Sequence, residues 1–197
     1  YGILLIFDEV ITGFGRFGTM SASEYFGVMP DIITMAKGLT NGAVPMGATF
    51  VRKEIYDAFM HGPEQFIELM HGYTYSGHPL AAAAVIGNLD AVNDQKIWDN
   101  ARAMAKPFEE AMHSLKGVPH IVDVRNCGIL CGIQVEEHKD KGDPGRWCRE
   151  AAYELFRRGV MVRYTGPNLC VSPPLILNQN HIDEIASKIK DVMKWLS

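Results

Sequence analysis

The sequence predicts an α/β protein, and two observations support that prediction. The first apolar run, ILLIF at residues 3–7, is rich in branched residues without polar alternation, which is typical of a parallel strand covered on both faces. Further along the chain, apolar residues recur every 3.6 positions, which is typical of amphipathic helices. With 197 residues, 47% of them hydrophobic, the chain can bury one large core or two smaller ones.

Three short strands are expected in the first fifty residues. The first (ILLIFDEV) has its polar end at Asp8, the second (PDIITMAKG) ends at Lys37, and the third (GATFVRKEI) starts near Gly47 and runs to Val51. Each strand thus has a polar residue at its carboxyl end. Ligands of an open α/β sheet lie beyond those ends, so this edge of the sheet is the candidate site.

Two helices are expected next along the chain. Pro79 stands in the first turn of an apolar, alanine-rich helix (PLAAAAVIGNLDAV). Over residues 96–115 the apolar positions repeat near 3.6, which predicts one long amphipathic helix in spite of Pro107. Because this helix leads into a new set of strands, we expect two domains, residues 1–95 and 96–197.

The second domain is predicted to combine strands and helices. HIVDVR and GILCGIQVE read as an antiparallel pair, and VMVRYTG and NLCVSPPLIL as two further strands. Between the pairs, HKDKGDPG is a solvent loop and GRWCREAAYELFRRG a helix that ends at Gly159. Asn178 or Asn180 can cap a last helix that ends at Trp195.

The glycines at positions 13, 15 and 18 follow the spacing G-x-G-x-x-G. A dinucleotide-binding fingerprint needs its last glycine to open a helix, and an acidic residue at the end of the next strand. The segment TMSASEYFGVMP leaves hardly any room for a crossover helix, and Asp31 begins the next strand. A dinucleotide site is therefore disfavoured, and a plain glycine loop stays open.

Asp8 and Lys37 suggest a different chemistry. A carboxylate at the end of so apolar a strand is costly to bury alone, and Lys37 could be its partner. Alternatively, both residues serve one aromatic cofactor. In pyridoxal phosphate chemistry a lysine forms a Schiff base with the aldehyde, while a carboxylate keeps the pyridine nitrogen protonated. The spacing alone leaves both interpretations open.

Composition disfavours several other classes of function. Nineteen basic and twenty-three acidic residues give a net charge of -4 without a basic run, so nucleic acid is not an expected partner. The longest apolar stretches, 3–7 and 80–89, are far shorter than the roughly 20 residues of a membrane span. No membrane association is expected, and we expect a cytoplasmic protein. The chain starts at Tyr1, without methionine and directly in a strand, so a fragment is expected.

Other chemistry-bearing residues lack the partners that their chemistry requires. The four cysteines have no pattern of a metal site or a disulfide framework, so reduced, buried thiols are expected. No third ligand joins His71 and His78, so no metal site is expected. Ser76 lacks a His and Asp pair for a hydrolase triad.

Three segments carry a specific resemblance. LLIFDEVITGFGRFG, PDIITMAKGLTNGAVPMGA and GYTYSGHPLAAAA resemble, in order and wording, the class III aminotransferases among the fold type I pyridoxal-phosphate enzymes. The resemblance extends over the whole chain and matches roughly the carboxyl-terminal half of such an enzyme. It implies part of the large, mainly parallel-sheet domain, followed by a smaller carboxyl-terminal α/β domain.

The resemblance also implies roles for five residues. Asp8 would pair with the pyridinium nitrogen, and Val10 would pack against the ring. Lys37 would be the Schiff-base lysine and the base that moves the substrate proton. Thr74 would bind the cofactor phosphate of the neighbouring subunit, which implies a homodimer with a shared active site. Arg163 would hold the substrate carboxylate with two parallel hydrogen bonds.

The implied function is a pyridoxal 5'-phosphate-dependent aminotransferase. It would move an amino group from an ω-amino acid or amine to a keto acid such as pyruvate, in a ping-pong cycle. Two alternatives stay open: a catalytically incomplete fragment or homologue that serves as a dimerising or binding module, and an aminomutase or decarboxylase on the same scaffold. The phosphate-binding Gly and Ser segment and the ring-stacking aromatic residue of the family lie upstream of these residues.

Overall fold

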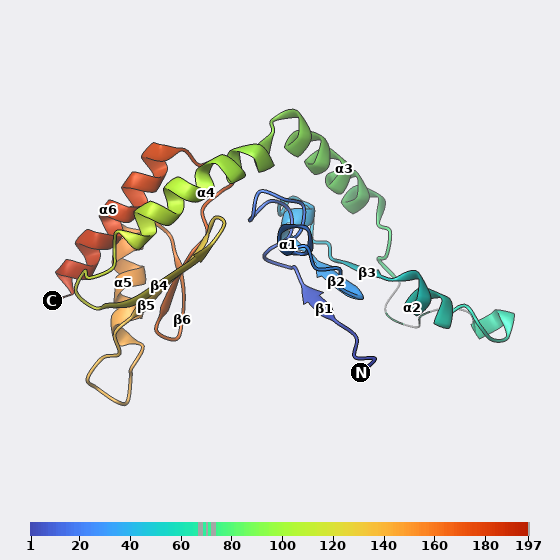
Figure 1. Cartoon of the computed structure of the whole chain (residues 1–197), viewed down its shortest axis with the longest axis horizontal. Helices are drawn as coiled ribbons and strands as arrows, with labels where there is room; N and C mark the ends of the chain where they lie inside the picture. The colour runs from blue at the N-terminus through green and yellow to red at the C-terminus, as the bar shows by residue number, and fades with distance from the viewer. Residues whose placement is uncertain (67–68, 70, 72–73, 197) are drawn as a thin grey trace. The chain divides into compact units, whose positions relative to one another are not determined.

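The computed structural model describes every residue except 67, 68, 70, 72, 73 and 197. The chain forms two compact units (Figure 1). Unit 1 comprises Tyr1–Gly15 and Thr19–Trp98, and unit 2 comprises Arg16–Gly18 and Asp99–Ser197. Among the described residues, no helix combines the length and apolar character needed to cross a membrane.

Unit 1 contains a three-stranded sheet in the order β1 (Ile6–Asp8), β2 (Ile32–Met35) and β3 (Ala48–Val51). Strands β1 and β2 are parallel, as expected, with Asp8 opposite Thr34. Strand β3 runs antiparallel to β2, so the expectation that its carboxyl end lies at the same edge is wrong. The connection between them, residues 36–47, contains the single 3-10 turn η1 (Lys37–Leu39) but no helix that could form a crossover.

The connection between the parallel strands holds a short helix, α1 (Ala22–Phe26). The Ser21 side chain caps it by accepting a hydrogen bond from the Glu24 amide at 3.1 Å. The expectation that this segment has hardly any room for a helix is therefore wrong. A helix of five residues, about one and a half turns, fits into this connection between β1 and β2.

The core of unit 1 is small. It consists of Phe14, Met35 and Leu39, with partly buried residues around them, among them Val85 and Leu89. The last two belong to α3 (Pro79–Asp94), which begins at Pro79 as expected. The unit also contains α2 (Lys53–Ala58) and two single 3-10 turns, η1 (Lys37–Leu39) and η2 (Glu64–Phe66).

Much of the apolar surface of unit 1 stays uncovered by the described residues. Leu4, Leu5 and Ile6, at the start of the first strand, are 55, 42 and 57% exposed. The expectation of a strand covered on both faces is therefore not met within this chain. Within the described residues β1 pairs with β2 alone, and its side chains alternate between exposed and half-buried.

Unit 2 has a four-stranded antiparallel sheet in the order β4-β5-β7-β6. Three helices accompany it, and their inward residues, such as Phe108, Leu155 and Ile189, are fully buried in one core with Ile133 and Leu169 of the sheet. The elements are α4 (Ile97–His113), β4 (Ile121–Cys127), β5 (Leu130–Val135), α5 (Arg146–Arg157), β6 (Arg163–Thr165), β7 (Asn168–Val171) and α6 (Gln179–Trp195). The expected antiparallel pair, the helix through Pro107 and the cap at Asn178 are confirmed.

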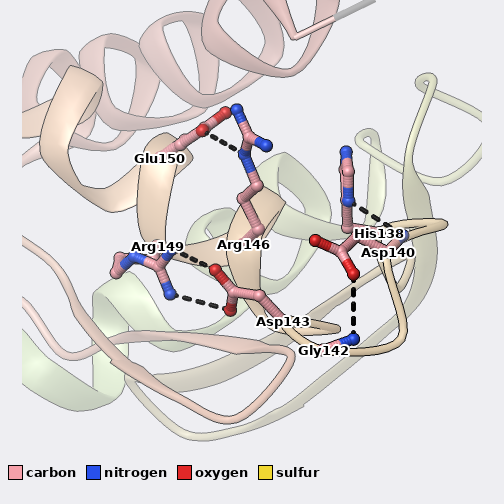
Figure 2. A network of polar contacts seen from close by, with 7 residues as sticks. All are labelled: His138, Asp140, Gly142, Asp143, Arg146, Arg149 and Glu150. Carbon is pink, nitrogen blue, oxygen red and sulfur yellow. Dashed lines mark hydrogen bonds and ion pairs between the residues drawn. The ribbon is translucent and has the colours of Figure 1, made fainter.

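The expected solvent loop before α5 is held by its own polar side chains (Figure 2). Asp143 accepts two hydrogen bonds from Arg149, at 3.0 and 2.5 Å, and Arg149 holds the pKa of this carboxyl below its usual value. Asp140 accepts from the Gly142 amide at 2.9 Å, while the Asp140 amide donates to His138 at 3.1 Å. These contacts tie the loop to the first turns of α5.

Candidate functional site

Asp8, the last residue of β1, carries an oriented carboxylate. Its Oδ1 accepts hydrogen bonds from the Val10 amide at 3.1 Å and from the Thr34 hydroxyl at 3.4 Å. Thr34 is the direct partner of Asp8 on β2. The carboxylate is exposed and no ion pair between it and Lys37 is found, so the alternative in which Lys37 pairs a buried Asp8 is not supported. Two neutral donors fix its direction and leave its charge available to a ligand.

Lys37 begins the 3-10 turn η1, just past the end of β2. Its φ is +45°, a left-handed conformation that is uncommon for a lysine and concentrates at functional sites. The next residue, Gly38, lies so close to Phe14 that an added Cβ would stand 2.7 Å from the Phe14 Cβ. Only glycine fits there, which accounts physically for the A-K-G sequence.

These residues meet at one edge of the sheet. Because β1 and β2 are parallel and Asp8 faces Thr34, the carboxyl ends of both strands point the same way. Lys37 follows Thr34 by three residues, and half-buried Val10 follows Asp8 by two. The structure therefore brings Asp8, Val10 and Lys37 to the same edge of unit 1.

The sequence analysis did not single out Glu9. Of the two adjacent acids Asp8 and Glu9, Glu9 is the buried one, with 1% of its surface exposed. Its carboxylate accepts hydrogen bonds from the amides of Ala22 and Ser23, at 2.5 and 2.9 Å, and from the Thr12 hydroxyl at 3.3 Å. It thus caps the first turn of α1. Because these amide partners lie 13 and 14 positions further along the chain, the sequence carried no signal for this role.

Replacing Glu9 with Ala is expected to lower the free energy of unfolding by about 3 kcal/mol, because charge-assisted hydrogen bonds to two amides are lost and those amides become unsatisfied. Urea-induced unfolding measures this. The matched control is Glu54→Ala, at an exposed residue in the first turn of α2, with an expected change within about 0.5 kcal/mol. An equally small change for Glu9→Ala would contradict the capping role.

The glycine loop packs against protein and needs no dinucleotide to account for it. An added Cβ on Gly18 would stand 2.7 Å from the Cβ of Arg102 and 2.9 Å from its Cα. Arg16, between the last two glycines, accepts a hydrogen bond from the Ile129 amide at 2.9 Å and donates to the Pro173 carbonyl at 2.5 Å. Burial lowers the pKa of this guanidinium. The last part of the motif thus belongs to unit 2.

Thr74 lies in the turn that precedes α3. It lines an open groove of about 750 Å³ formed by Val44, Pro45, Met46, Gly47, His71, Thr74, Tyr75, Ser76, Gly77, His78 and Ala81. Asp8, Val10 and Lys37 are not among the residues that line this groove, and the role of Thr74 at the cofactor phosphate stays a prediction. His78 caps α3 by accepting from the Leu80 amide at 3.3 Å. Within the described residues, no three His, Cys, Asp or Glu side chains form a possible metal-binding group.

Arg163 is the first residue of β6 in unit 2. It is exposed, and its guanidinium has no hydrogen-bond or ion-pair partner among the described residues. The surface salt bridge that arginines at strand ends often form is therefore not found there. A free guanidinium is available for a carboxylate ligand, but its place relative to Asp8 and Lys37 stays a prediction.

The cysteines are free thiols. Burial raises the pKa of both Cys131 and Cys148 to about 12, so at neutral pH they stay protonated and unreactive. They are parts of the unit 2 core. The burial of these two thiols is as expected, while Cys127 and Cys170 are only half-buried.

The family model for aminotransferase class-III matches residues 1–193. An omega-aminotransferase from Caulobacter vibrioides is 48% identical over 193 residues, which are 98% of this chain and 44% of that protein. A beta-alanine–pyruvate aminotransferase from Pseudomonas aeruginosa is 41% identical over 100% of this chain and 44% of its own length. The chain thus spans less than half the length of these relatives.

Solved structures show the same likeness. An amine transaminase from an uncultivated Pseudomonas species, in its PLP-bound form, superposes with a TM-score of 0.89 at 36% identity, over 100% of this chain and 45% of that one. An (S)-enantioselective omega-transaminase from Thermomicrobium roseum gives a TM-score of 0.88 at 35% identity, over 100% and 44%.

The fold is that of pyridoxal-phosphate-dependent transaminases, with an oriented carboxylate and a lysine at the ends of neighbouring parallel strands. The chain belongs to the class III aminotransferases. This class uses pyridoxal 5'-phosphate as its cofactor.

Proposed function

We propose that this chain supplies the lysine and the pyridine-binding carboxylate of a pyridoxal-phosphate-dependent aminotransferase. The observation that carries the proposal is the placement of Asp8 and Lys37 at the carboxyl ends of two adjacent parallel strands. Since the relatives are more than twice as long as this chain, the activity belongs to the polypeptide or assembly in which these residues work.

The residues at this edge fit the cofactor chemically. When bound, pyridoxal phosphate supplies an aldehyde that captures amines and a ring that withdraws electrons. Asp8 would hold a proton on the ring nitrogen, with its carboxylate already oriented by the Val10 amide and Thr34. Lys37 would hold the cofactor through its Nζ amine, and the same amine would take the proton from the substrate carbon. Val10 would pack against a face of the ring.

The proposed assembly is a homodimer with shared active sites. Thr74 would donate a hydrogen bond from its hydroxyl to the cofactor phosphate of the partner, and its exposed position in an open groove leaves the hydroxyl accessible to such a ligand. Unit 1 would be part of the large domain, and unit 2 the small carboxyl-terminal domain. The boundary then falls at Trp98/Asp99, three residues after the sequence-based one. A cytoplasmic location stays a prediction.

We propose ω-amino acids or amines as donors and a keto acid such as pyruvate as acceptor. The names of two similar proteins, an omega-aminotransferase and a beta-alanine–pyruvate aminotransferase, support this substrate class. Arg163 supports it chemically, because an unpaired guanidinium can hold a substrate carboxylate with two parallel hydrogen bonds.

Covalent labelling tests the proposed function. Purified protein is mixed with pyridoxal phosphate, reduced with borohydride, and digested for mass spectrometry. Stoichiometric labelling confined to Lys37 is the expected result. Scattered or absent labelling in this chain is followed by the same experiment on the longest polypeptide that contains it. Failure there as well would refute the cofactor role and favour a non-catalytic binding module.

Replacing Arg163 with Ala is expected to raise KM for a carboxylate-bearing substrate by roughly 10- to 100-fold, because a bidentate charged hydrogen bond is lost. KM for an amine donor without a carboxylate should stay within about twofold, since no such bond is made to it. Steady-state kinetics with both donors measure the difference. Arg157→Ala is the matched control, because Arg157 is an exposed arginine of the same unit whose pairing with Glu154 stabilises little. Equal effects on both donors would contradict the assignment.

A further inference from the structure

We propose that Asn88, on helix α3, is a positioning residue for Lys37. By holding the turn that carries the lysine, it sets the direction from which Nζ meets the cofactor aldehyde. This inference rests on the role proposed for Lys37. Nothing in the motifs that surround Lys37 points to Asn88, which lies about fifty positions further along the chain.

The side-chain amide of Asn88 donates hydrogen bonds to two successive backbone carbonyls. Nδ2 of Asn88 donates to the Gly38 carbonyl at 2.8 Å and to the Leu39 carbonyl at 3.3 Å. Both carbonyls belong to the turn η1, which Lys37 opens. A single donor group thus restrains two adjacent peptide units, directly after the lysine.

Asn88 lies on the side of α3 that packs against the core of unit 1. It is half-buried, and its helix neighbours Val85 and Leu89 pack against the core of Phe14, Met35 and Leu39. A polar side chain on the packed side of a helix requires partners, and satisfying them fixes how the helix lies on its neighbour. Leu39, whose carbonyl Asn88 holds, belongs to that same core.

The turn needs such a support because its backbone is unusual. Lys37 has φ +45°, a conformation that persists only when the surrounding structure enforces it. From one side, Phe14 packs against Gly38; from α3, Asn88 holds the carbonyls of Gly38 and Leu39. Without the Asn88 donor, the peptide units after Lys37 can rotate, and the path of the long lysine side chain changes with them. Misplacement of a reacting group by about 1 Å can cost on the order of 100-fold in rate.

The test compares Asn88→Asp and Asn88→Ala with the same changes at Asn93, an exposed residue near the end of the same helix. Aspartate keeps the size of the side chain but has no N–H donor, and its charge faces two carbonyl oxygens. Four properties are measured on the cofactor-loaded protein, in this chain or in the longest polypeptide that contains it: the pH midpoint of the cofactor absorbance, the rate of borohydride-trappable attachment to Lys37, kcat with KM, and the melting temperature.

For both Asn88 variants we expect kcat about tenfold lower with KM changed by less than about twofold, since the lysine acts on bound substrate. We also expect attachment to Lys37 about tenfold slower and a pH midpoint moved by at least about half a unit, because the lysine meets a different environment. Both Asn93 variants should match wild type in every property.

A lower melting temperature with unchanged pH midpoint, attachment rate and kcat would overturn the inference, because Asn88 would then support only the fold. If Asn88→Asp does not fold, Asn88→Ala decides by the same criteria, since it adds no charge. Wild-type protein that is not labelled at Lys37 would refute the proposed function itself. Normal wild-type labelling with unaffected Asn88 variants would refute this inference alone.

Discussion

Replacing Lys37 with Ala is expected to abolish transamination and to remove the borohydride-stable label. In the role proposed for Lys37, its amine is both the attachment point and the base, so its loss should lower turnover by roughly 10⁴-fold or more. Steady-state kinetics and peptide mapping measure both effects. The position tolerates the change sterically, because Lys37 is exposed and its turn is held by contacts of Gly38 and Leu39.

Lys53→Ala serves as the control for Lys37→Ala. Lys53 is an exposed lysine of the same unit, ion-paired with Asp57 on α2. Its removal should leave both labelling and turnover unchanged, since such surface pairs stabilise little. Retention of normal turnover in Lys37→Ala would contradict the role proposed for this lysine.

Replacing Asp8 with Asn is expected to leave cofactor binding partly intact but to reduce turnover by on the order of 10²- to 10³-fold. The asparagine oxygen can still accept from the Val10 amide and the Thr34 hydroxyl, so the local geometry is kept. The neutral amide cannot hold a proton on the ring nitrogen, and the ring then withdraws electrons poorly. Cofactor titration and steady-state kinetics separate the two effects.

Asp57→Asn is the matched control for Asp8→Asn, because Asp57 lies on α2 in the same unit and pairs with exposed Lys53. It should behave as wild type. Near-normal kinetics of Asp8→Asn would show that its charge is not needed, and would leave Asp8 with the structural role of joining the ends of β1 and β2.

Local patterns predicted most of the elements. The 3.6-residue period gave α4, Asn178 marked the start of α6, and Pro79 marked the start of α3. These features depend on residues that are close in sequence, so they can be predicted without knowledge of the tertiary structure. The direction of β3 could not be read in this way, because an isolated strand pattern does not say which neighbour it pairs with or in which sense.

In the candidate site, too, some residues could be predicted from the sequence and others were found only in the folded chain. The resemblance assigned Asp8, Val10, Lys37, Thr74 and Arg163, of which the structure brings the first three to one sheet edge. It assigned nothing to Glu9 or Asn88. Their partners are 13 and 14 positions away for Glu9, and 50 and 49 for Asn88, so only the folded chain reveals them.

By itself, the sequence predicted the family, a candidate lysine and a candidate carboxylate for the cofactor, and the two strands that carry them. Side-chain chemistry and short-range periodicity can be inferred directly from the order of residues. Only the tertiary structure decided which acid is buried, which way β3 runs, and which distant amide supports the lysine turn. Those outcomes depend on packing between segments far apart in the chain, where a hydrogen bond forms only if the fold brings donor and acceptor together.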